Sequence, residues 1–403
     1  MKNFFNAIGV ADMEKVHSAM IAWILDDDND PLMSSSKTTN ASSHFYTFPI
    51  DIRSKLLCKI FGVQLNYYKS IKTYVEWNDI DIMIETEDTQ GAKDVWVIEN
   101  KLKSQEHISQ VSADEKKRWK INSDTIWQTE KYEHIIVKDY CLNTSTQTHF
   151  TLLSLGGDKA KSPTGNWSSY TYRDLSCFLM RQNLNNYVLI REYGDSISRI
   201  INELGKFLNT KAPSNYTHVF NKLKKSQKAS AQLSQDERFI VENGLETIFQ
   251  KQFLAKIIAD KLPKLTNKVR YDERNGVAMF IVPVGWIGDY ELNIEFQGGT
   301  FKVVLLHKDY IKRGSSNYTK PLYHKVYPVF QKLISNSGWS IACAKNLQNP
   351  QNPQNGTAKP RIALDKNIAP KGKHWYDDLS QFNSVYVEAQ ILANNILTSV
   401  HQI

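Results

Sequence analysis

The sequence predicts an α/β protein with a mixed sheet, followed by a second, α+β region. In the first half, segments of helical apolar spacing alternate with segments of two-residue period, in the order helix, three strands, helix, strand and helix. In the second half, helical segments come first and alternating strands follow. A chain of 403 residues also exceeds the usual size of one hydrophobic core, so two domains are the default expectation.

The first half opens with two segments of helical spacing, Met13–Leu25 and Ile50–Phe61, separated by a polar stretch. From Tyr67 the apolar period changes to two, which is typical of strands. Gly91 marks a turn before the last of these strands. The expected strands are Ile71–Trp77, Ile80–Glu85 and Val95–Leu102; a helix within Ile108–Tyr140, a strand at Phe150–Leu155 and a helix at Tyr172–Met180 follow.

The composition of the sequence changes here to a lysine-rich segment followed by helical segments, which places a domain boundary between about Thr210 and Ser230. We therefore expect a first domain at residues 1–210 and an α+β domain at residues 230–403. The elements expected in the second domain are helices within Ser234–Leu262, antiparallel strands at Val277–Val284, Glu291–Phe296 and Phe301–Leu306, an exposed loop at Gln348–Pro360 and a final helix at Trp375–Ser399.

Composition limits the class of protein. Apolar residues make up 41% of the chain and charged residues 23%, the balance of an ordered globular protein. The sequence has no signal-peptide pattern and no run of eighteen apolar residues, so we expect a cytoplasmic protein that does not enter a membrane. Its four cysteines lie far apart without paired spacing, which argues against a zinc site or a disulfide framework.

The formal charge of +8 is unevenly distributed, because an excess of lysine and arginine between Gly205 and Lys320 accounts for it. A basic region favours a polyanionic partner such as nucleic acid. Many proteins of similar isoelectric point bind no nucleic acid, so charge alone does not decide the function.

Two neighbouring strands carry the pattern that bears on chemistry. In the first, three isoleucines share one face while Asp81 lies on the other. In the second, one face changes from valine to charged residues, Glu99 and Lys101. If the two strands form a hairpin centred on Gln90, Asp81 falls opposite Glu99.

Carboxylates directly opposed across a hairpin repel each other, because their Cβ atoms are only about 4.5 to 5.5 Å apart. A cation between them removes that repulsion. Oxygen atoms of Asp81 and Glu99, together with a backbone carbonyl, for which Asn100 is the candidate, and water, suit Mg²⁺ or Mn²⁺. Such an ion polarises a phosphoryl oxygen and lowers the pKa of bound water, while Lys101 can orient that water.

A solitary Glu-x-Lys is usually a solvated surface pair, and Asp81 alone is equally consistent with a residue on a polar strand face. The combination of these residues with their surroundings favours a functional site instead. An apolar strand leads directly into Glu99-Asn100-Lys101, and an aspartate stands at hairpin-matched distance from it. We therefore interpret these residues as a candidate site for phosphodiester hydrolysis.

The segments Ile80-Asp81-Ile82 and Val97-Ile98-Glu99-Asn100-Lys101 resemble the signature of the PD-(D/E)xK nucleases, in a variant that lacks the proline. The resemblance covers approximately residues 10 to 180. It implies a restriction-endonuclease-like core, a mixed four-stranded sheet flanked by helices. It also implies Mg²⁺-dependent cleavage of DNA or, less often, RNA.

The resemblance extends to auxiliary residues. The segment beginning at Glu14 is similar to the first helix of this group, whose glutamate points toward the metal site. Gln128 and Tyr132 match the Q-x-x-x-Y element of RecB-like members, in which the glutamine positions metal or substrate. Gln110 stands nearer to the position usual for that glutamine, so both glutamines remain candidates, with Gln128 favoured because Tyr132 accompanies it.

The hypothesis is a metal-dependent endonuclease or exonuclease, acting on DNA in preference to RNA, with restriction or antiphage defence as its setting. The lysine-rich segment Asn221–Lys228 would help to select substrate. A homodimer, or a complex with a separate motor or defence protein, is the expected assembly. The alternatives are a non-catalytic nucleic-acid-binding module and a partner-dependent subunit of a restriction or repair complex.

Overall fold

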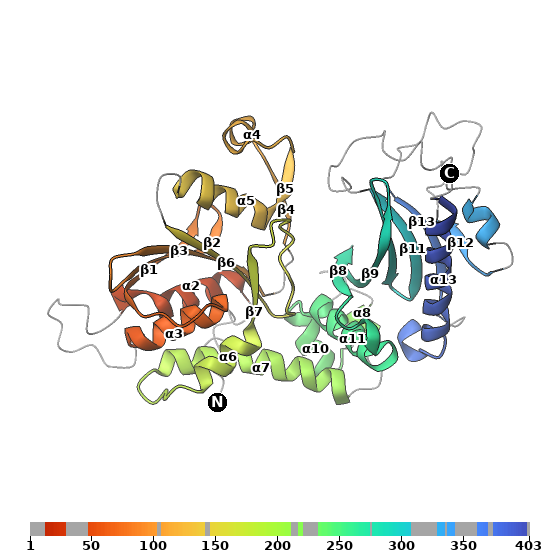
Figure 1. The fold of residues 1–403 in the computed structure, drawn as a ribbon. Helices are drawn as coiled ribbons and strands as arrows, with labels where there is room; N and C mark the ends of the chain where they lie inside the picture. The colour runs from red at the N-terminus through yellow and green to blue at the C-terminus, as the bar shows by residue number, and fades with distance from the viewer. Residues whose placement is uncertain are drawn as a thin grey trace. The chain divides into compact units, whose positions relative to one another are not determined.

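The computed structural model shows two sheets, each accompanied by helices (Figure 1). The chain divides into two compact units, residues 1–206 and 207–403. The structure describes residues 13–29, 47–102, 106–141, 146–210, 217–220, 233–274, 276–307, 329–334, 337–342, 361–369 and 374–400. The lysine-rich segment Asn221–Lys228 and the expected loop Gln348–Pro360 lie outside the described residues.

The sheet of the first unit has the order β1-β2-β3-β6-β7. Its first three strands form an antiparallel meander, whereas β6 runs parallel to β3 and β7 parallel to β6. The mixed sheet is as predicted, but it has five strands rather than four. Its strands are β1 (Tyr68–Trp77), β2 (Ile80–Asp88), β3 (Lys93–Lys101), β6 (Gln147–Ser154) and β7 (Trp167–Thr171).

Helices cover both faces of this sheet (Figure 1). On one face lie α2 (Glu14–Leu25) and α3 (Ile50–Phe61), both close to their predicted bounds. On the other face, side chains of α5 (Gln128–His134) pack against valines of β3 and Phe150 of β6. Two further helices, α6 (Tyr172–Met180) and α7 (Val188–Thr210), follow the last strand; α6 was predicted and α7 was not.

The segment predicted to contain one helix, Ile108–Tyr140, is more divided than expected. It contains β4 (Ile108–Gln110), α4 (Ala113–Trp119) and β5 (Thr125–Trp127), with β4 and β5 paired as a two-stranded ribbon. A capping box of Ser112 and Glu115 begins α4, and Lys120 in the left-handed conformation ends it. Beyond this ribbon, α5 continues as a π-helical segment, η3 (Ile135–Tyr140).

A buried ion pair ties the two helices on one face to the edge of the sheet. Arg53 of α3 is fully buried, and its Nη1 lies 2.6 Å from Oδ1 of Asp27 and 3.1 Å from the carbonyl oxygen of Leu25. The other carboxylate oxygen of Asp27 accepts a 2.7 Å hydrogen bond from the backbone N–H of Ile71 in β1. Asp26 accepts from the N–H of Thr73 in the same way, so these two carboxylates satisfy two N–H groups of the edge strand.

The second unit contains a six-stranded antiparallel sheet of order β12-β13-β11-β10-β9-β8. The three strands predicted here are confirmed as β9, β10 and β11, and the final helix as α13, which begins later than expected. The strands are β8 (Arg270–Arg274), β9 (Val277–Ile287), β10 (Tyr290–Gln297), β11 (Thr300–His307), β12 (Ser340–Ala342) and β13 (Arg361–Asn367), and the helices are α8 (Thr217–Phe220), α10 (Gln235–Glu242), α11 (Glu246–Lys261) and α13 (Phe382–Val400). Within the described part of the chain, no helix combines the length and the apolar character needed to cross a membrane.

Loss of the buried arginine should destabilise the first unit. Arg53→Met leaves the Asp27 carboxylate buried without its cation, and we expect the free energy of unfolding to fall by about 3 to 5 kcal/mol in chemical denaturation. The control is Lys55→Met on the same helix, which removes an exposed pair with Asp51 and should cost less than about 1 kcal/mol. Equal losses in the two variants would show that the buried pair does not hold these elements together.

Candidate active site

The hairpin of β2 and β3 brings the two predicted carboxylates together. Its register pairs Glu87 with Lys93 and Ile82 with Ile98, which confirms the predicted centre at Gln90. One further step along both strands places Asp81 opposite Glu99. Sheet pairing is not continued there, and instead Oδ2 of Asp81 accepts a 2.8 Å hydrogen bond from the backbone N–H of Asn100.

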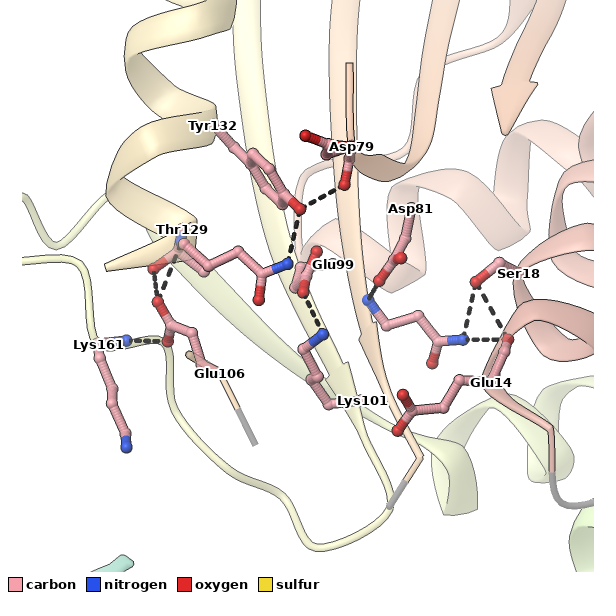
Figure 2. A network of polar contacts seen from close by, with 12 residues as sticks. Glu14, Ser18, Asp79, Asp81, Glu99, Lys101, Glu106, Thr129, Tyr132 and Lys161 are labelled. Carbon is pink, nitrogen blue, oxygen red and sulfur yellow. Dashed lines mark hydrogen bonds and ion pairs between the residues drawn. The ribbon is translucent and has the colours of Figure 1, made fainter. Parts of the chain in front are cut away.

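Glu99 is the most enclosed group of the site (Figure 2). Its side chain is fully buried, and the ammonium nitrogen of Lys101 lies 2.5 Å from its Oε1 as an ion pair. Neither carboxylate oxygen accepts a hydrogen bond of ordinary geometry from any described residue. A buried carboxylate usually satisfies its oxygens with several donors, so this one has unused capacity for a ligand.

The electrostatics of the three groups are coupled. Burial raises the pKa of Glu99 well above its usual range, and the neighbouring charge of Asp81 raises it further. Burial likewise raises the pKa of Asp81, although Lys101 and the N–H of Asn100 oppose this. Burial lowers the pKa of Lys101, but Glu99 and Asp81 outweigh it, so this pKa is raised and the lysine is cationic at neutral pH. Two carboxylates thus share one cation.

This donor set fits a small divalent cation. Mg²⁺ prefers oxygen ligands and retains several waters, so it is commonly held by one or two carboxylates. In the part of the chain that the structure describes, no three His, Cys, Asp or Glu side chains gather as a ready-made metal cluster. Asp81 and Glu99 would therefore hold an ion with a backbone oxygen and water completing its shell. The two oxygens of Glu99 that accept no hydrogen bond support this fit.

Hydrogen bonds to neighbouring residues occupy the side-chain amide of Asn100. Its Nδ2 donates 3.0 Å hydrogen bonds to Oγ of Ser18 and to the carbonyl oxygen of Glu14, and its Oδ1 accepts a 2.5 Å hydrogen bond from the hydroxyl of Tyr172. Only its backbone carbonyl is left as an oxygen ligand. The N–H and C=O of a strand residue point to the same side, so this carbonyl faces the same side as Asp81. Ser18 and Tyr172 carried no pattern that would have identified them from sequence.

Glu14 stands in the first turn of α2, where the amide of Asn100 fixes its carbonyl. Its side chain points toward Lys101 (Figure 2) and its charge contributes to raising the pKa of both Lys101 and Asp81. The structure therefore places Glu14 beside the site, at the end of a helix whose other end is fixed by the Asp27 and Arg53 pair.

The structure places the two candidate glutamines differently. Gln128 is buried at the start of α5; its Nε2 donates a 2.7 Å hydrogen bond to the hydroxyl of Tyr132, and its Oε1 has no partner among the described residues. Tyr132 in turn donates to the carbonyl oxygen of Asp79, directly before β2. Gln110 is exposed at the end of β4. The segment between the two glutamines contains α4 and β5.

A second buried glutamate, which sequence patterns did not indicate, supports the start of α5 (Figure 2). One carboxylate oxygen of Glu106 accepts hydrogen bonds from the N–H and the hydroxyl of Thr129, and the other accepts a 2.7 Å bond from the N–H of Lys161. These bonds hold Gln128 and the loop carrying Lys161 in fixed positions. Glu106 is thus satisfied by hydrogen bonds, in contrast to Glu99.

A mixed sheet with helices on both faces, and two carboxylates and a lysine at one end of its central hairpin, defines the class of restriction-endonuclease-like proteins. Residues 2–241 match the PD-(D/E)XK nuclease superfamily, and the chain belongs to that superfamily. Nucleases of this superfamily generally use divalent metals. No curated protein and no solved structure matches the chain. The predicted family and fold class are confirmed.

The raised pKa of Glu99 predicts how stability depends on pH in the absence of metal. The folded state binds this proton more tightly than the unfolded state, so the stabilising effect is complete below the ordinary pKa of 4.5 and is lost as pH rises through the folded-state value. In EDTA, Glu99→Gln should therefore match the wild type near pH 4. At pH 7 to 8 it should be more stable, by more than the roughly 0.5 kcal/mol typical of surface substitutions.

Denaturant midpoints across this pH range provide the measurement. The matched control is Glu87→Gln on β2, since the hydrogen bond and charge of Lys69 lower the pKa of Glu87 and its contribution is lost as pH falls. That variant should be slightly less stable than the wild type at neutral pH. A Glu99→Gln protein that is also less stable at pH 7 would mean that Lys101 fully compensates the buried charge.

Proposed function

We propose that this chain is a metal-dependent nuclease that hydrolyses phosphodiester bonds, in DNA in preference to RNA. The observation that carries the proposal is the fully buried Glu99 carboxylate, which lies against Asp81 and for which Lys101 is the only cation partner among the described residues. A pair of carboxylates arranged in this way gains stability from a cation, and membership of a nuclease superfamily supplies the substrate class. Mg²⁺ or Mn²⁺ is the ion that we propose.

Each residue has a distinct part in the proposed reaction. Asp81 and Glu99, with the carbonyl of Asn100, would hold the ion, which when bound polarises a phosphoryl oxygen and lowers the pKa of water. Lys101 is held cationic by its two carboxylate neighbours, so we assign it to orient the attacking water and to stabilise charge on the phosphoryl oxygens. The sequence suggested the same role, that of orienting the water.

Two residues complete the arrangement from outside the hairpin. Glu14 adds negative charge beside Lys101 at the start of α2. Gln128 offers an amide oxygen without a partner among the described residues, from a position fixed by Tyr132. We assign both as positioning residues for the ion, its waters or the substrate. Restriction or antiphage defence, with a second copy or a separate motor protein as partner, is the setting that we propose.

The first prediction of this proposal concerns Lys101. Linear, circular and single-stranded DNA, and RNA, should be tested with Mg²⁺, Mn²⁺ or EDTA. We expect cleavage with either ion and none in EDTA, and a rate in Lys101→Ala at least about 100-fold lower, the usual effect of removing one charge-stabilising group. Lys93→Ala is the control, because Lys93 is an exposed residue at the other end of the same strand.

Salt-sensitive binding of DNA without cleavage, by a folded wild-type protein and with either ion, would contradict the enzymatic proposal. It would favour a binding module that retains the nuclease fold. Equal cleavage by Lys101→Ala and Lys93→Ala would leave the nuclease in place and overturn the assignment of Lys101.

The second prediction separates the two glutamines. Gln128→Ala should lower the cleavage rate by about 10- to 100-fold, the range typical of residues that orient metal ligands. Gln110→Ala is the matched control and should leave the rate within about twofold of the wild type, because Gln110 is exposed on the ribbon. The reverse order of effects would assign the auxiliary role to Gln110.

A further inference from the structure

A cavity of about 400 Å³ lies at the turn between β1 and β2, against α4 and η3. Its volume is in the range of small-ligand pockets in proteins. Asp79 is one of its lining residues, and it stands two positions before Asp81 in the chain. The proposed roles of Asp81, Glu99 and Lys101 do not involve this cavity.

Three aromatic side chains line the cavity: Trp77, Trp119 and Tyr140. The rings of Trp77 and Tyr140 meet edge to face, with centroids 5.2 Å apart. Trp119 is only 4% exposed: His134 stacks on its ring, the Arg118 guanidinium carbon lies 5.6 Å from its centroid, and its Nε1 donates hydrogen bonds to the carboxylate of Asp139. The accessible aromatic surface of the cavity therefore comes from Trp77 and Tyr140. Aromatic walls that are held in place favour a flat, aromatic ligand.

The charges of the lining argue against a phosphate as the ligand. Arg118 Nε lies 3.0 Å from Oδ1 of Asp139, and Lys131 Nζ lies 3.4 Å from Oε1 of Glu115. Both cations of the lining are therefore paired with carboxylates. Asp79 is exposed, and its carboxylate has no hydrogen-bond or ion-pair partner among the described residues, so the cavity retains one uncommitted acceptor group.

The backbone around this acceptor is a two-residue hairpin turn, and it is held in place. Asn78 and Asp79 adopt the left-handed conformation, with φ of 49° and 67°. The hydroxyl of Tyr132 holds the carbonyl of Asp79 in place. Across the cavity, Tyr140 ends a π-helical segment, a rare form that is frequently found at functional sites. The hydroxyl of Tyr132 also accepts a hydrogen bond from Gln128, and this contact ties the cavity to the candidate active site.

We propose that this cavity binds one base of the substrate strand and prefers guanine; the inference rests on the nuclease function proposed above. Guanine presents two adjacent donors, N1–H and the N2 amino group, which match the two oxygens of the Asp79 carboxylate. Cytosine and adenine present one amino donor beside an acceptor, and uracil and thymine place carbonyls on both sides of their donor. The two residues from Asp79 to Asp81 span about 7 Å. The cavity therefore lies close enough to the candidate site for one substrate strand to reach both.

The test measures binding of guanosine, adenosine, cytidine and uridine, with ribose as the probe without a base, to the full chain in EDTA by saturation-transfer difference NMR titration. Nucleosides carry no phosphate, so neither metal nor cleavage enters the result. We expect guanosine to bind at least about fivefold more tightly than uridine, and ribose to show no saturable binding. Stacking contributes about 5- to 150-fold per base, so Trp77→Leu should weaken guanosine binding within that range.

Asp79→Asn tests the acceptor without disturbing the turn, because asparagine tolerates the left-handed conformation. This variant should lose the preference for guanosine over adenosine. The matched control is Glu76→Gln, which removes one negative charge from the same hairpin at another left-handed position, outside the cavity, and should keep that preference.

Three results would overturn the proposal. They are no nucleoside binding above that of ribose, a guanosine preference that survives in Asp79→Asn, and a guanosine preference that is lost in Glu76→Gln as fully as in Asp79→Asn. If the wild-type protein also cuts nucleic acid in a metal-dependent way, any of these results refutes only the base pocket and leaves the proposed nuclease function in place. Guanosine binding that behaves as expected in a protein that cuts nothing refutes the proposed nuclease function and leaves the pocket.

Discussion

The burial of two adjacent carboxylates beside a single lysine is the constraint around which the first unit is arranged. Glu99 is fully buried, Lys101 is its only ion-pair partner among the described residues, and Asp81 stands opposite it on the hairpin. Such an arrangement lowers stability unless a cation balances it, so the surrounding structure must be strong enough to hold the pair together before any ion arrives. The three central strands and the helices on both faces provide that strength.

Hydrogen bonds to backbone atoms position the site more than contacts between its functional side chains. Asn100 joins β3 to α2 and α6, which sets where Glu14 begins its helix. Tyr132 joins α5 to the turn before β2, which sets where Gln128 lies. The bonds to Glu14 and Asp79 end on backbone carbonyl oxygens, and the bonds from Tyr172 and Gln128 join uncharged side chains. None of these groups is ionised, so these ties do not include the charge of the carboxylates. Such supports keep α2 and α5 in place whichever of the neighbouring carboxylates is protonated.

Sequence patterns predicted the hairpin well because both of its strands alternate strictly, and a one-residue slip would turn the isoleucines of β2 out of the core. The same patterns failed in Ile108–Tyr140, since strands of three residues are too short to show a period and α4 is set by its caps. The fifth strand and α7 were also not predicted. Asn100 was identified as a ligand candidate from its place in the motif, but its amide role depends on Ser18 and Tyr172, which are distant in sequence.

The inserted ribbon and α4 have a structural consequence for the active site. They place Trp119 and Arg118 beside the β1–β2 turn, and they separate Gln110 from Gln128 so that only the second stands at the start of α5. One hairpin turn therefore has two different surroundings, a charged one at Asp81 and an aromatic one at Asp79. Because Tyr132 is bonded to the carbonyl between them, a ligand that moved the turn would also move Gln128. The position of the turn and the position of Gln128 are thus physically linked through one hydroxyl group.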